Sequence, residues 1–171
     1  MKQLTIFRIL TFILLPIAAM FGFMDFLFLF SALANPALLL MVFVLAAFVI
    51  YTFASLKFLT KHIDVERPCS NSLRDWIRVN AFVSMFMGIL FLLNAVSILF
   101  MGDISLRQFV NQFRESQPNI PAMLTTELFL TIMKGVAYFM FFVSCILISH
   151  ILINFRIMKT YGYLFEPPRS A

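Results

Sequence analysis

The chain has 171 residues, of which 62% are hydrophobic and only 12% are charged, whereas an ordinary soluble domain is roughly 45–50% apolar and about 25% charged. A chain this short cannot bury so much apolar surface within itself in water, so a soluble globular domain is excluded. The high hydrophobicity also excludes intrinsic disorder, and two cysteines are too few for a disulfide scaffold. The composition therefore indicates a protein embedded in lipid.

Four segments are long and apolar enough to cross a hydrocarbon layer of ~30 Å, which needs about 20 helical residues. They cover residues 9–30, 37–56, 79–100 and 135–155. No tandem repeat or flexible linker separates them. We therefore predict an all-α integral membrane protein, residues 1–171, in which four transmembrane helices form a small bundle as a single domain.

The connections carry helix-capping signals. Asn35 can cap the second helix, and Pro36 can occupy its first position, where a missing N–H costs nothing. Ser72 and Asp75 have the spacing of a capping box at the start of the third helical segment. Pro16 is expected to kink the first helix. These signals favour a hairpin of the first two helices and a polar loop before the third.

The distribution of Lys and Arg predicts the orientation, because loops rich in these residues stay on the cytoplasmic side. Arg107 and Arg114 fall on one side of the predicted membrane and ten basic residues fall on the other. The ten are Lys2, Arg8, Lys57, Lys61, Arg67, Arg74, Arg78, Arg156, Lys159 and Arg169. We therefore expect both termini in the cytoplasm, with the protein in a bacterial inner membrane. The net charge of +5 fits contact with anionic lipid headgroups and requires no nucleic-acid partner.

The N-terminal segment also has one feature of a signal peptide. Ala32, Leu33 and Ala34 follow an apolar run and resemble a signal-peptidase site, which has small residues on either side of a variable one. The run is longer than a usual signal sequence, stays bulky up to Phe30 and contains an acidic residue, Asp25. We therefore expect an uncleaved transmembrane helix.

The common catalytic and ligand-binding motifs are absent from the sequence. It contains no HExxH, CxxC, GxxxxGKS, GxGxxG or GxSxG string. His62 and His150 are expected in a loop and within the fourth helix, which does not suit a metal or haem site. Cys69 and Cys145 are expected at different depths, too far apart for a disulfide. The sequence thus predicts no catalysis, no cofactor and no metal.

Polar residues at membrane depth are the main candidates for a functional site, because ionisable groups are costly there. Counted from the basic residue at the cytoplasmic end of each helix, Asp25, Asn94 and Tyr138 lie at similar depth, and Lys134 lies one turn further out. An ion pair of Asp25 with Lys134 could gate a pathway or bind a polar ligand. Alternatively, Lys134 extends to the interface while Asn94 and Tyr138 form ordinary interhelical hydrogen bonds.

A second polar layer is predicted nearer the cytoplasm. Tyr51, Ser84 and His150 each lie six residues from the basic residue of their helix, or ~9 Å inside the boundary. We expect His150 to be a neutral, hydrogen-bonded core residue. A proton relay or pH sensor is the alternative, but this layer offers it no acidic partner.

Small residues indicate where the helices pack closely. Ala18 and Gly22, and likewise Ser84 and Gly88, have the small-xxx-small spacing that lets backbones approach in lipid.

Residues 105–116 form the most distinctive segment outside the predicted spans. Leu106, Phe109, Val110 and Phe113 follow the i, i+3, i+4, i+7 pattern, with polar residues on the other face. This pattern predicts an amphipathic helix, with Ser105 as its cap, that lies on the outer leaflet or against a partner. Its apolar face is the candidate docking face.

The function that best fits these features is a non-catalytic accessory or regulatory subunit of a larger membrane complex, with membrane lipids and either other subunits or further copies of itself as partners. The alternative is a small oligomeric transporter or channel that uses the outer polar cluster of Asp25, Asn94, Lys134 and Tyr138. An enzyme acting on lipid or quinone has too little support from Tyr51, Tyr138 and His150.

Overall fold

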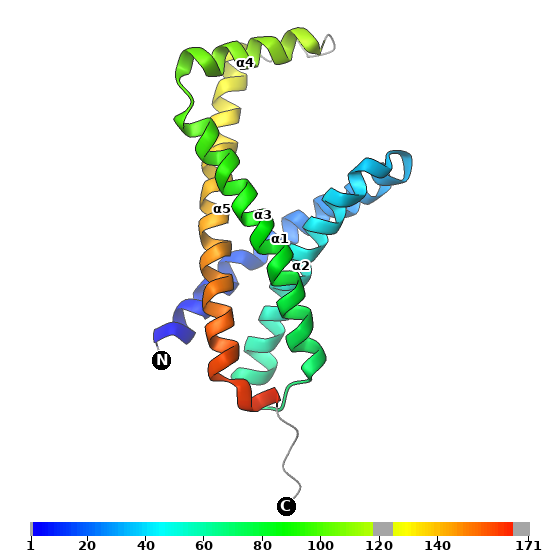
Figure 1. The fold of residues 1–171 in the computed structure, drawn as a ribbon, viewed down its shortest axis with the longest axis vertical. Coiled ribbons are helices and arrows are strands. Elements are labelled where there is room, and N and C mark those ends of the chain that lie inside the picture. The colour runs from blue at the N-terminus through cyan, green and yellow to red at the C-terminus, as the bar shows by residue number, and fades with distance from the viewer. Residues whose placement is uncertain (1, 118–124, 166–171) are drawn as a thin grey trace, which may run out of the picture. The chain divides into compact units, whose positions relative to one another are not determined.

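The computed structural model describes residues 2–117 and 125–165, and the elements among them are all helical (Figure 1). Arg169, which the prediction of the orientation used, lies outside the described residues. In chain order the elements are α1 (Lys2–Ala34), η1 (Pro36–Leu38), α2 (Leu39–Phe58), η2 (Leu59–Ile63), α3 (Asn71–Phe100), α4 (Asp103–Ser116), α5 (Thr126–Thr160) and η3 (Gly162–Phe165). The expected all-helical fold is confirmed for this part of the chain.

Four of the helical segments are long and apolar enough to cross a membrane, as the sequence predicts. They are Lys2–Ala34, Pro36–Ile63, Asn71–Phe100 and Thr126–Thr160. Each extends beyond the apolar run that predicts it, because polar and charged residues continue the helix past the apolar segment. Pro16 lies inside α1, which continues through it.

The contacts divide the chain into two compact units. One comprises residues 1–88 and 146–171, and the other comprises residues 89–145. Helices α3 and α5 contribute to both. The prediction of a single domain stays a prediction, and each unit is described by itself below.

In the first unit, α1 and α2 form the expected hairpin. The Asn35 side-chain oxygen accepts a hydrogen bond from the Ala37 N–H at 3.2 Å, and Pro36 opens η1, which leads into α2. A Cβ added to Gly22 would lie 3.5 Å from the Val49 side chain, an ordinary van der Waals distance, so the two helices are neighbours at this point. Asn35 and Pro36 thus start the short helix η1 that precedes α2, whereas α2 itself begins at Leu39 with no side-chain cap.

The start of α3 differs from the prediction. The helix begins at Asn71, and its cap is Ser70, whose hydroxyl accepts a hydrogen bond from the Leu73 N–H at 3.3 Å. Ser72, the predicted cap, already lies within the helix. Serine at either position can accept from the N–H three residues on, so local spacing alone does not choose between them.

The end of the first unit that holds η2 and η3 is tied together by contacts distant in sequence. Arg8 forms an ion pair with Asp64 at 2.6 Å, and the Cys69 N–H donates to the Leu164 carbonyl at 2.6 Å. The rings of Phe58 and Phe165 stack at 5.3 Å. This packing buries Cys69, and the burial raises the pKa of its thiol.

In the second unit, α4 packs on the first turns of α5. Leu106 and Val110 of α4 are fully buried against Leu130 of α5, with Phe129 partly buried beside them. Helix α4 begins at Asp103 after Gly102, so Ser105 lies inside the helix and the predicted capping box with it is wrong. An amphipathic helix is confirmed in this part of the sequence, and its placement at the membrane interface stays a prediction.

Candidate functional site

A buried hydrogen-bond network in the first unit joins α1, α2 and α5 around His150. The imidazole Nδ1 lies 2.7 Å from the Tyr51 hydroxyl, and Nε2 lies 2.9 Å from the Thr11 hydroxyl. All three side chains are fully buried. The Phe7 ring stacks on the imidazole at a centroid distance of 4.8 Å. Both ring nitrogens of His150 are thus occupied by hydroxyl groups of the protein itself.

The direction of these hydrogen bonds follows from the number of protons. The Thr11 hydroxyl donates its one proton to the Phe7 carbonyl at 2.7 Å. It can therefore only accept from His150, which fixes the imidazole tautomer with hydrogen on Nε2. With no acid among its contacts, a buried imidazole is neutral, because an unpaired buried charge is costly. Nδ1 then accepts the proton of the Tyr51 hydroxyl.

Asn154 extends the network along α5. The Tyr51 hydroxyl donates its one proton to His150, so its oxygen can only accept a further hydrogen bond. The Asn154 amide nitrogen donates to this oxygen at 3.2 Å. The same nitrogen donates to the Ser55 hydroxyl at 2.8 Å. The Asn154 side-chain oxygen is buried, and no described residue forms a hydrogen bond with it. The orientation of this amide is therefore determined by its neighbours.

This arrangement suits a structural role better than proton transfer. The chain of donors runs from Asn154 through Tyr51 and His150 to Thr11, and it ends on the main-chain carbonyl of Phe7. A carbonyl in a helix does not release or take up a proton, so the chain has no terminal acid or base. The network instead fixes the rotation of three helices relative to one another, because each bond requires one register.

The sequence predicted part of this network. Tyr51 and His150 share a layer, as expected, and they form a direct hydrogen bond. Ser84 is also fully buried, but its hydroxyl has no partner among the described residues. Thr11 and Asn154 were not predicted as site residues. The signal available for Asn154 was its position four residues after His150, one turn further along the same face of α5.

The predicted outer cluster has other contacts. The Lys134 ammonium donates to Asp103 at 2.9 Å, so its partner differs from the expected Asp25. The Asn94 amide donates to the Leu90 carbonyl of its own helix, and Tyr138 is 64% exposed. One carboxylate oxygen of Asp25 is buried and has no hydrogen-bond partner among the described residues. Lys134 contacts a residue outside the apolar spans because its long, flexible side chain extends the ammonium group toward the end of the helix.

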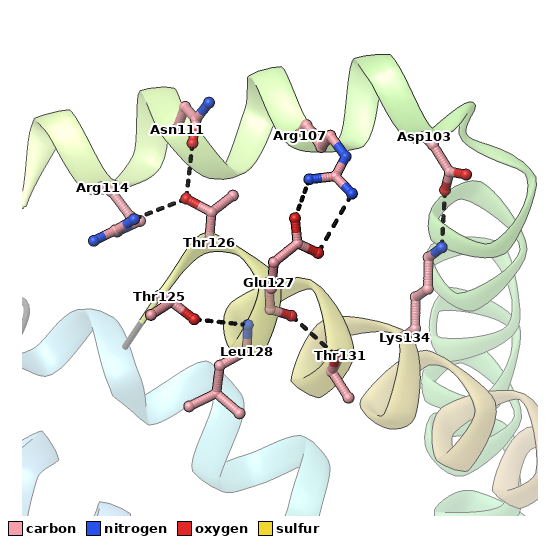
Figure 2. Close-up of polar contacts among 10 residues, drawn as sticks. All are labelled: Asp103, Arg107, Asn111, Arg114, Thr125, Thr126, Glu127, Leu128, Thr131 and Lys134. Carbon is pink, nitrogen blue, oxygen red and sulfur yellow. Dashed lines mark hydrogen bonds and ion pairs between the residues drawn. The ribbon is translucent and has the colours of Figure 1, made fainter. Parts of the chain in front are cut away.

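Polar contacts hold α4 against the start of α5 (Figure 2). Arg107 forms a bidentate ion pair with Glu127, and Asp103 forms an ion pair with Lys134. Thr126 bridges two α4 residues, accepting from Arg114 at 2.8 Å and donating to Asn111 at 3.1 Å. Hydrogen bonding to Lys134 lowers the pKa of the Asp103 carboxyl, and the contact with Glu127 raises the pKa of the Arg107 guanidinium.

The candidate docking face of α4 is divided by this packing. Leu106 and Val110 are fully buried against α5 and are not available to a partner. Phe109 and Phe113 remain 49% and 40% exposed, although the Phe113 ring also contacts Phe129. The apolar stripe is wider than its contact with α5, so one part of it is covered and the other is left at the surface.

No family model, curated protein or solved structure matches this chain. The fold alone therefore defines the class of protein, which is a helical protein with four helices long and apolar enough to span a membrane. Among the described residues, no cluster of His, Cys, Asp or Glu could hold a metal ion.

Proposed function

We propose that this protein is a non-catalytic membrane protein that acts as an accessory or regulatory subunit of a larger complex, with both termini in the cytoplasm of a bacterial inner membrane. The observation that carries this proposal is the half-covered face of α4. The helix is fixed by buried contacts and ion pairs, yet it leaves Phe109 and Phe113 exposed. The closed His150 network supports a role without catalysis.

The partner is another membrane protein chain, which contacts α4 on the side opposite the cytoplasm. Exposed aromatic rings surrounded by polar side chains are typical of protein interfaces, where a few aromatic residues carry most of the binding energy. On α4 the polar surroundings are Asn111, Gln112 and Glu115, all exposed. A helix that only lies on lipid requires no such fixed attachment to its own protein.

Replacement of both exposed rings tests the subunit role. We expect Phe109→Ser with Phe113→Ser to weaken the complex roughly 30-fold or more, since even a single interface hot spot contributes about 2 kcal/mol or more. The measurement is the mass and stoichiometry of the complex extracted from native membranes. The control is Gln112→Ser, at an exposed polar position of the same helix, which should leave the complex intact. The same complex with and without the two rings would overturn the proposal.

A small oligomeric transporter is the second candidate, and Asp25 is the observation that favours it. One oxygen of the Asp25 carboxylate is buried in an apolar helix, and within the described part of the chain it has no hydrogen-bond partner. Such an oxygen can bind a cation or exchange a proton. If this function is correct, ion flux into proteoliposomes should be lost in Asp25→Asn and kept in Asp64→Asn, a matched change in the loop. Absence of flux in the unmodified protein would exclude this candidate.

A further inference from the structure

A groove of about 800 Å³ lies between α2 and α3 in the first unit. Its walls are apolar: Phe43, Ala46 and Ile50 come from α2, and Val79 and Val83 come from α3. Phe43 and Val79 are 60% and 63% exposed, so the groove opens at the surface of the molecule. A surface of this composition in a membrane protein must be covered by an apolar occupant.

One end of the groove is polar. Ser72, Asp75, Trp76 and Asn80 line it, and they lie in the first turns of α3. Asp75 is the one charged residue among those that line the groove. Asp75 forms a long ion pair with Arg74, in which only its Oδ1 takes part, at 3.4 Å from the Arg74 Nε. The Asp75 side chain is 61% exposed. The polar end therefore presents the Asp75 carboxylate, whose Oδ2 forms no ion pair among the described residues.

The polarity gradient matches an amphiphile with a cationic group and an alkyl chain. The part of α3 that lines the groove, from Ser72 to Val83, is ~16 Å long, which is close to half the thickness of a ~30 Å hydrocarbon layer. An acyl chain of one leaflet has this reach, and its headgroup would lie beside Asp75. Trp76 lies at the same level, and its ring is 56% exposed, as is usual for tryptophan at the membrane interface.

The volume fits an acyl chain. Clefts for small molecules measure roughly 300–1,000 Å³, and this groove falls in that range. Arg78 is exposed and follows Asp75 by one turn of α3, a spacing that puts the two residues on the same side of the helix.

We infer that this groove binds a phospholipid with a primary-amine headgroup, phosphatidylethanolamine, with its ammonium on Asp75 and its acyl chain between α2 and α3. Asp75 gives the site its preference over phosphatidylglycerol, which has a phosphate but no amine. Asn80 adds an acceptor. Its amide nitrogen donates a hydrogen bond to the Trp76 carbonyl at 2.8 Å, which leaves its oxygen to accept from a ligand. This site does not depend on the subunit role proposed above.

The test is native mass spectrometry of the purified full-length protein, in detergent with equal amounts of phosphatidylethanolamine and phosphatidylglycerol that carry identical acyl chains. We expect the unmodified protein to retain the amine lipid preferentially. Asp75→Asn should reduce this preference about tenfold, since a hydrogen bond to a charged group contributes ~1.5–3 kcal/mol. Glu66→Gln, which removes an exposed charge from the preceding loop, should leave the preference unchanged.

A second pair of variants tests the acyl-chain part of the groove. Ala46→Trp should fill it and reduce retention of both lipids, whereas Leu40→Trp, at a position 73% exposed on the same helix, should not. A photoreactive residue at Val79 should form an adduct with the mass of the amine lipid. Equal retention of the two lipids by the unmodified protein, an undiminished preference in Asp75→Asn, or an adduct to a second copy or another polypeptide would overturn the inference.

Discussion

At the scale of single residues, Tyr51 is the centre of the buried network, because it donates to His150 and accepts from Asn154. We expect Tyr51→Phe to lower the free energy of unfolding by about 1–3 kcal/mol, since it leaves two buried polar groups unsatisfied. The control is Tyr138→Phe at an exposed position, which should change stability by less than ~0.5 kcal/mol. Unfolding in mixed micelles measures both values. Equal effects would show that the network does not stabilise the fold.

Asp103 offers a test of the α4 ion pairs. Its pKa is lowered below the ordinary 3.8 chiefly by the hydrogen bond from Lys134. A lowered pKa in the folded state means that the stabilising contribution is complete above the unfolded pKa and is lost as pH falls through the folded value. An NMR titration of the Asp103 carboxyl should therefore give a midpoint below 3.8, which moves up toward 3.8 in Lys134→Gln. The same midpoint in both proteins would show that the pair does not form in solution.

At the scale of helices, the glycines distinguish close contacts from open surface. A Cβ added to Gly88 would lie 3.3 Å from Ile148, whereas one added to Gly135 meets nothing within 4 Å. Gly88→Val should thus lower the free energy of unfolding by about 1–3 kcal/mol more than Gly135→Val, because overpacking adds to the change in helix propensity that both share. Thermal unfolding of the two variants measures the difference. Equal losses would contradict close packing of α3 on α5 at this point.

At the scale of the whole molecule, the orientation can be tested at Gln112 on α4. The charge distribution predicts that α4 lies on the side opposite the cytoplasm. In a variant with Cys69→Ser and Cys145→Ser, we expect Gln112→Cys to react with an impermeant thiol reagent added outside intact cells, because this side chain is exposed. A cysteine at Glu66, in the predicted cytoplasmic loop, should react only after the membrane is opened. The reverse pattern would show that the orientation is wrong.

The sequence by itself determined the class of protein and its helices. Apolar runs of about 20 residues predict spanning helices because the lipid thickness sets their length, and the periodicity of residues 105–116 predicts an amphipathic helix. It also determined that Tyr51 and His150 lie at one level, since depth can be counted along a helix from its basic end. These properties depend on distances along the chain, which the sequence contains.

Only the tertiary structure decided which polar groups meet. Thr11 joins His150 because α1 is rotated to present that face, and Lys134 pairs with Asp103 because α4 turns back over the start of α5. The same packing divides the apolar stripe of α4, which covers Leu106 and leaves Phe109 at the surface. Helix rotation and crossing depend on the combined packing of many side chains, so no single stretch of sequence determines them.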